Sequence, residues 1–208
     1  MAGIVTGSNV LTDRYPYTDT EKQWPVEAEN LKDHIVATGT YDDDLILGIH
    51  GYIASATEEI ENRGQVALIQ QKRIQYISES DLPYLEGTTV ELAVRPVIAV
   101  TAVKYLDANE ATQTLSSTLY RVSENTQSVY FKVGLPALAD GPNTLWIEYT
   151  AGFGTVTSSV PASWANLVKI VAARRYDYRS GDGTNQAMAW ERMITGLVRI
   201  AGDSSHRG

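Results

Sequence analysis

Carboxylates are plentiful in this sequence and are groups that can do acid–base chemistry. The chain has 25 Asp and Glu residues, and two carboxylates in one cleft can act as general acid and base, as in glycoside hydrolases. Asp81, Glu86 and Glu91 fall in expected strands and turns, where a solvated surface position accounts for them. Residues 42–44 are all aspartate, but the glycine and distal glutamate of a calcium loop do not follow. We interpret them as residues that begin a helix, where the backbone dipole stabilises negative charge.

Other catalytic groups have no recognisable context either. The chain has no cysteine, which excludes disulfides and thiolate sites. Its three histidines form no i, i+4 pair. The sequence contains no nucleophile elbow, no phosphate-binding glycine loop with lysine, no zinc-protease motif and no dinucleotide fingerprint. We therefore expect no catalytic residue, no metal site, no cofactor and no enzyme activity.

The charge balance limits the partners. The 17 Lys and Arg residues against 25 acidic ones give a formal charge of −8. This argues against a surface that grips nucleic-acid phosphates over a wide area, whereas an acidic wall would let DNA pass without sticking. The first residues lack the basic start and apolar run of a secretory signal, and the longest apolar stretch, residues 97–103, is too short to cross a bilayer. We expect synthesis in the cytoplasm and no membrane contact.

The chain is organised around residues 146–179, where a strand leads into a helix. Leu145, Ile147 and Tyr149 alternate with polar residues, which predicts a half-buried strand. Gly152 and Gly154 then permit a sharp turn. A helix follows, with N-cap oxygens offered by Ser158 and Ser159, Pro161 in its first turn, and an apolar face of Trp164, Leu167, Val168, Val171 and Ala172.

Two further helices are predicted before this stretch and one after it. The first covers residues 27–36. The second begins at residues 41–44, ends at Gly64 as a C-cap, and repeats apolar residues at Leu45 or Ile46, Ile49, Ile53, Ala56 and Ile60. Between them and the helix that follows Gly154, residues 65–150 contain short runs typical of strands, separated by polar turns, which predicts about six antiparallel strands in a sandwich or small barrel. The last helix carries Trp190, Met193, Ile194 and Leu197.

The order of these elements predicts an α+β fold. Because short helices are marginal alone, we expect the two N-terminal and two C-terminal helices to pack together as a discontinuous helical bundle with an inserted antiparallel β module. The expected segments are an extended N-terminal arm at 1–23, helical residues 24–64 plus 158–202, the β module at 65–157 and a flexible tail at 203–208. A disordered tail is the other interpretation of residues 1–23.

Several short motifs follow one another along residues 24–201. They are Pro25-Val26-Glu27-Ala28, Asp42-Asp43, Arg95-Pro96-Val97, Val103-Lys104-Tyr105-Leu106-Asp107, Tyr120-Arg121-Val122, the run from Tyr149 to Gly154, Val160-Pro161 and Tyr176-Asp177-Tyr178-Arg179. In this order they resemble the head-tail connector (adaptor) proteins of tailed bacteriophages. The arm and tail depart from the pattern, so no role is carried over to them.

This resemblance implies a structural virion protein located in the neck, between capsid and tail. It implies a ring of identical subunits, a dodecamer, that docks on the portal protein and offers a platform to a neck, stopper or tail protein. Double-stranded DNA would pass through the lumen without specific binding.

Some residues are candidates for contacts with the portal or with other subunits. The resemblance implies that the C-terminal region reaches toward the portal, so we expect Trp190, Met193 and Leu197 to dock there, with Arg174 and Arg175 nearby. Core packing is the simpler interpretation of Met193 and Leu197, and the two arginines also complement the end of their helix. The aromatic residues Tyr15, Tyr17, Trp24 and Trp190 are further candidates, because aromatics are enriched at interface cores.

Two other classes of protein remain open. One is a carbohydrate- or protein-binding module of a phage tail, which exposed aromatics clustered on one sheet face would favour. The other is a hydrolase with paired carboxylates, which buried acids sharing a cleft would favour.

Overall fold

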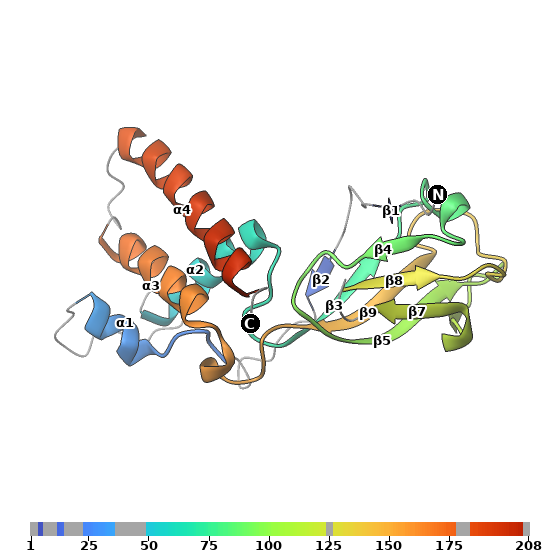
Figure 1. The fold of residues 1–208 in the computed structure, drawn as a ribbon, viewed down its shortest axis with the longest axis horizontal. Helices are drawn as coiled ribbons and strands as arrows, with labels where there is room; N and C mark the ends of the chain where they lie inside the picture. Colours follow the sequence, from blue (N-terminus) through green and yellow to red (C-terminus); the bar gives the residue numbers. More distant parts are fainter. Residues whose placement is uncertain are drawn as a thin grey trace. The chain divides into compact units, whose positions relative to one another are not determined.

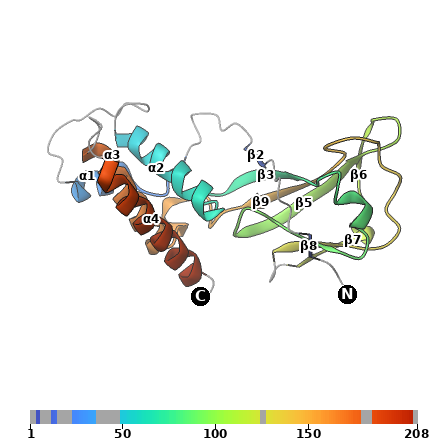
Figure 2. The ribbon, with the colours of Figure 1, turned by 90° about the horizontal axis from the view of Figure 1, so that it is seen from above.

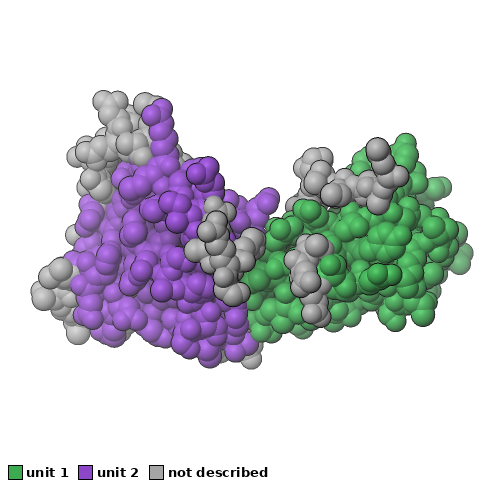
Figure 3. Space-filling view, viewed as in Figure 1, with its two compact units in different colours: residues 1–17, 70–152 green, residues 18–69, 153–208 purple. Residues whose placement is uncertain are grey.

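The computed structural model describes residues 4–5, 12–14, 23–35, 49–123, 127–177 and 184–205. Contacts divide the chain into two compact units, coloured separately in Figure 3. We call Met1–Tyr17 with Gln70–Gly152 the β unit, and Thr18–Ile69 with Phe153–Gly208 the helical unit.

The chain has the α+β fold that its sequence predicts. The described helices are α1 (Ala28–His34), α2 (Ile49–Gly64), α3 (Ala162–Asp177) and α4 (Thr184–Ser205), with short 3-10 turns η1 (Leu82–Tyr84), η2 (Ser117–Leu119) and η3 (Thr157–Ser159). The strands are β1 (Ile4–Val5), β2 (Thr12–Arg14), β3 (Gln71–Tyr76), β4 (Thr89–Glu91), β5 (Val97–Leu106), β6 (Thr112–Thr114), β7 (Tyr120–Ser123), β8 (Ser128–Phe131) and β9 (Leu145–Ala151). Two helices thus precede β3 to β9 and two follow them, and α2 contacts both C-terminal helices.

The helical unit is built around the pairing of α2 with α3. Both α1 and α4 pack on this pair, and Figures 1 and 2 show α4 next to α3. The apolar faces predicted from the sequence form the core, because the buried side chains include Ile53, Ala56 and Ile60 of α2 and Trp164, Leu167, Val168, Val171 and Ala172 of α3. The predicted positions 45, 46 and 49 lie outside the side chains that the structure describes.

Two details at the helix ends differ from the predictions. The positive φ after α2 belongs to Gln65 (47°), not to Gly64, which is the last residue of α2. A Cβ on Gly64 would lie 3.0 Å from the Trp164 ring, so this glycine gives room to the indole and is not a left-handed C-cap. At α3, Ser158 and Ser159 form η3 and provide no N-cap, and the carbonyl of Pro161 accepts the first helical hydrogen bonds.

The β unit contains two sheets. One has the order β2-β3-β9-β5-β6 and is antiparallel throughout, and the other has the order β1-β4-β8-β7, in which only β1 runs parallel to its neighbour. Strand β9 is central in the larger sheet and has the predicted alternation, with Leu145, Ile147 and Tyr149 buried. Gly152 (φ 133°) and Gly154 (φ 158°) then take the backbone angles that the predicted turn requires.

The start of the predicted strand run is wrong. The apolar residues Val66, Leu68 and Ile69 form no strand, and they pack in the core of the helical unit. The ladder with β9 begins only at Gln71. A short, fully buried apolar run has no period that separates strand from other structure, so the sequence could not show this boundary.

The ends of the chain carry elements that the pattern did not indicate. Strands β1 and β2, in the segment expected as an extended arm, pair with β4 and β3. Helix α4 continues to Ser205, into the segment 203–208 expected as a tail. No described helix is long and apolar enough to span a bilayer.

Candidate functional site

The basic end of α3 is held by contacts within the helical unit. The Arg174 guanidinium lies 4.2 Å from the centre of the Trp190 ring, which is cation–π geometry. Arg175 Nη2 lies 2.7 Å from Glu59 Oε2, and the same carboxylate pairs with Arg63 at 3.0 Å. The structure therefore brings together Arg174 and Trp190, which the sequence nominated for partner binding, but it uses them to join α3 to α4.

The aromatic and apolar candidates differ in exposure. Trp24, Trp190 and Leu197 are partly buried and pack against the helical core, and the Trp24 carbonyl accepts a 2.7 Å hydrogen bond from the Thr157 hydroxyl. Met193 is 44% exposed, so the expected core packing of this residue is wrong. Tyr15 and Tyr17 lie outside the described residues.

Helix α4 presents a solvent-facing side on which Met193 is one of several exposed residues. Ile200, one heptad further along, is 62% exposed, and Arg192 and Arg199 are exposed beside this pair. Ile194, Val198 and Ala201 face the core from the opposite side. Ile200 was missed by the sequence analysis, although its spacing of seven residues from Met193 places both on one helix face.

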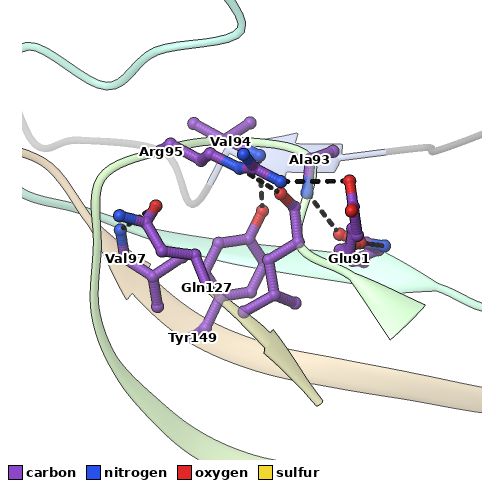
Figure 4. A network of polar contacts seen from close by, with 9 residues as sticks. Glu91, Ala93, Val94, Arg95, Val97, Gln127 and Tyr149 are labelled. Atoms are coloured by element: carbon purple, nitrogen blue, oxygen red, sulfur yellow. Dashed lines mark hydrogen bonds and ion pairs between the residues drawn. The ribbon is translucent and has the colours of Figure 1, made fainter. Parts of the chain in front are cut away.

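In the β unit, a polar network holds the segment between β4 and β5 (Figure 4). The Val94 N–H donates to the Tyr149 hydroxyl at 3.2 Å, and the Val97 N–H donates to Gln127 Oε1 at 3.2 Å. Gln75 accepts from the Ala93 N–H and donates to the Glu91 carbonyl, each at 2.9 Å. Burial raises the pKa of the Tyr149 hydroxyl above its ordinary value of 10.0. These hydrogen bonds fix the connection between β4 and β5.

Several of the described carboxylates are also occupied by structural contacts. Glu61 is buried and accepts from the Leu68 N–H at 2.9 Å, and Glu86 accepts from two backbone N–H groups, of Gly134 and Leu135. Burial alone would raise the pKa of Glu148, but hydrogen bonds from Lys104 and Trp146 bring it below its ordinary value. The burial of Glu61 was not predicted, and its place among exposed charges at the end of α2 gave no signal of it.

Metal and glycan sites find no support in the part of the chain that the structure describes. No group of three or more His, Asp or Glu residues there is arranged to hold a metal ion. The exposed large apolar residues of the β unit are Tyr84, Ile98 and Val133. Only one of these is aromatic, so the described sheets show no exposed aromatic cluster of the kind that would favour a carbohydrate-binding module.

Comparison with known proteins gives matches among solved structures. A chain in the structure of the virion of a native gene transfer agent (GTA) particle matches with a TM-score of 0.65 and 24% identity, over 84% of this chain and 88% of that one. A chain in the neck of an empty GTA particle, with C6 symmetry, matches with the same values. In the neck of a native GTA particle, with C12 symmetry, the TM-score is 0.63 at 21% identity, over 84% and 87% of the two chains.

No protein-family model matches the sequence, and no curated protein matches it. At 21–24% identity, the structural matches show a shared fold. Because they cover 84% of this chain, they extend over elements of both the helical and the β unit. The chain therefore has the fold of chains found in solved structures of the GTA particle and its neck.

Proposed function

We propose that this chain is a head-tail connector (adaptor) subunit in the neck of a tailed-phage-like particle. Copies of the chain form a ring that docks on the portal, extends the DNA channel and offers a platform to the next neck, stopper or tail protein. The observation that carries this proposal is the fold match at a TM-score of 0.65, which covers 88% of a chain from a GTA virion.

The chemistry of the chain supports a structural role. The carboxylates of Glu59 and Glu61, the α3 arginines and the polar network around Tyr149 all make contacts that hold the fold. The motif order along residues 24–201 supports the same role independently of the fold. We propose no reaction for this protein.

The proposed ring has twelve subunits, as the family resemblance implies, and a neck described with C12 symmetry among the structural matches agrees with this number. Duplex DNA passes through the lumen without specific binding, because a net charge of −8 per chain disfavours adhesion of phosphates. Of the residues nominated for partner binding, Met193 is retained as a contact with a partner, since its side chain is exposed.

Location in the particle tests this proposal. We would add an affinity tag at the C-terminus of the chain, purify particles that carry it, and locate a gold label against the tag by electron microscopy. We expect the label between capsid and tail. Label at the distal end of the tail would favour the alternative binding module, and its absence from particles would contradict the proposal.

Removal of α4 is a poor test of portal docking. Ile194, Val198 and Ala201 are buried in the helical core, so a chain ending near residue 181 would expose that core. The substitution Met193→Ser leaves the core intact, and Val133→Ser, at a residue 74% exposed in the β unit, is a matched control. Weaker particle incorporation of the first variant alone is the expected result.

A further inference from the structure

The solvent-facing side of α4 combines apolar and cationic residues that take no part in the apolar core of the described residues. Met193 and Ile200 are 44% and 62% exposed, and Arg192 and Arg199 lie beside them. Within the described residues, neither arginine has an ion pair, whereas Arg63, Arg95 and Arg175 each have one. We call residues 192, 193, 196, 199 and 200 the α4 face.

Gly196 lies in the middle of the α4 face. A Cβ built at this position meets nothing within 4 Å, so the packing of this chain does not require glycine there. A glycine inside a helix costs stability relative to alanine, and it allows another backbone to approach closely. We interpret the exposed apolar residues on both sides of this glycine as part of a surface that a second protein covers.

Helix α1 presents the complementary charge. Glu29 and Asp33 are exposed there, and so is Glu27 at its N-cap, while Leu31 faces the core. Glu29 pairs with Lys32 at 3.1 Å, but its side chain is still 81% exposed. Glu27 and Asp33 form no ion pair within the described part of the chain. We call residues 27, 29 and 33 the α1 face.

The helices that carry the two faces lie on different sides of α3. Both α1 and α4 pack on α2 and α3, and Figure 1 shows α3 between α1 and α4. A ring of identical subunits needs two different, complementary patches on each copy, because a head-to-tail contact is the kind that closes into a ring. We propose that the α4 face of one copy binds the α1 face of the next copy, with Arg192 and Arg199 against Glu27 and Asp33.

This inference rests on the proposed function and names the contact that builds the ring. Charge reversal tests it by sedimentation velocity of the full chain over a range of concentrations. The α4 variant is Arg192→Glu with Arg199→Glu, the α1 variant is Glu27→Arg with Asp33→Arg, and a third chain carries all four changes. Arg121→Glu, at an exposed arginine of the β unit, is the matched control. Circular dichroism checks that every variant is folded.

We expect the wild-type chain and the control to associate equally. The dissociation constant of each two-residue variant should be at least about tenfold higher than that of the wild type, since close interfacial charge pairs couple by more than 1 kcal/mol. The four-residue chain should recover association, which a role in folding alone would not produce. Association of the two-residue variants at the wild-type level overturns the inference, as does failure of the four-residue chain to recover or a wild-type chain that stays monomeric throughout.

Portal binding by the same variants separates this inference from the proposed function. If wild-type protein binds the portal and the charge reversals change neither binding nor assembly there, the α4–α1 contact is wrong and the adaptor role stands. If wild-type protein associates through these faces and binds no portal, the adaptor role is wrong and the contact stands.

Discussion

The helical unit and the β unit are stabilised in different ways. The core of the helical unit is one apolar cluster with residues from all four helices, and Glu61 is its buried charged residue. The β unit buries Gln71, Arg73, Gln75, Ser128 and Thr144 among its apolar residues, and it joins its strands through the network around Tyr149. A loss of packing should therefore damage the first unit most, and a loss of single polar groups should damage the second.

The largest expected effect comes from the helical core. Ile60→Ala removes a fully buried side chain between α2 and its neighbours and should lower the free energy of unfolding by about 2–5 kcal/mol. Ile200→Ala, at a position 62% exposed, should change it by less than about 0.5 kcal/mol. Urea denaturation gives both values, and hydrogen exchange should show the loss in the helices. Equal effects at the two positions would refute the assignment of the core.

The turn that follows β9, at the start of the C-terminal part of the helical unit, gives the next effect. A Cβ on Gly154 would lie 2.5 Å from Ser159 Oγ, at a φ of 158°. We expect Gly154→Ala to cost about 1–3 kcal/mol, because the serine must move. Gly196→Ala is the matched control, since its Cβ has open space, and it should stabilise the chain by about 0.5–1 kcal/mol. Thermal unfolding of both variants measures the two changes in stability. If Gly154→Ala leaves the stability unchanged, the Ser159 side chain moves without cost and the expected strain is wrong.

Loss of one polar atom should lower the free energy of unfolding of the β unit. Tyr149→Phe leaves the buried Val94 N–H without its acceptor and should cost about 1–3 kcal/mol. Tyr84→Phe, at a residue 72% exposed, is the control and should be close to neutral. Hydrogen exchange should place the change at residues 92–97. If protection falls equally in the helices, the two units do not respond separately.

Alkaline pH tests the same hydroxyl with a smaller effect. Because burial raises the pKa of Tyr149 above 10.0 in the folded chain, the unfolded chain loses this proton at lower pH than the folded chain. The stabilisation is fully present below about pH 10 and is lost as pH rises toward the folded pKa. Denaturation at pH 9 and pH 11 should show a steeper loss for wild type than for Tyr149→Phe. Parallel losses would contradict the burial of an ionisable hydroxyl at this position.

The same contrast explains what the sequence could predict. The α2 and α3 core residues recur with the helical period, so Ile53, Ile60 and Val168 were placed correctly from spacing alone. The alternation of β9 did the same for Tyr149. The fold class followed from the order of such elements.

The remaining features depend on residues far apart in the chain. Tyr149 accepts from an N–H 55 positions away, and Gly64 is adjacent to Trp164 only after α2 and α3 have packed. Spacing carries no signal for such contacts. At the candidate site, Met193 and Leu197 both fit a helical pattern, and only the packing of α4 shows that Met193 faces solvent and Leu197 does not.

The mass of the portal assembly with and without this chain tests the adaptor role most directly. Native mass spectrometry of the purified portal ring mixed with excess chain should show one added species, heavier by twelve copies of the 22.8 kDa chain. A portal ring whose mass is unchanged by the chain would contradict the account.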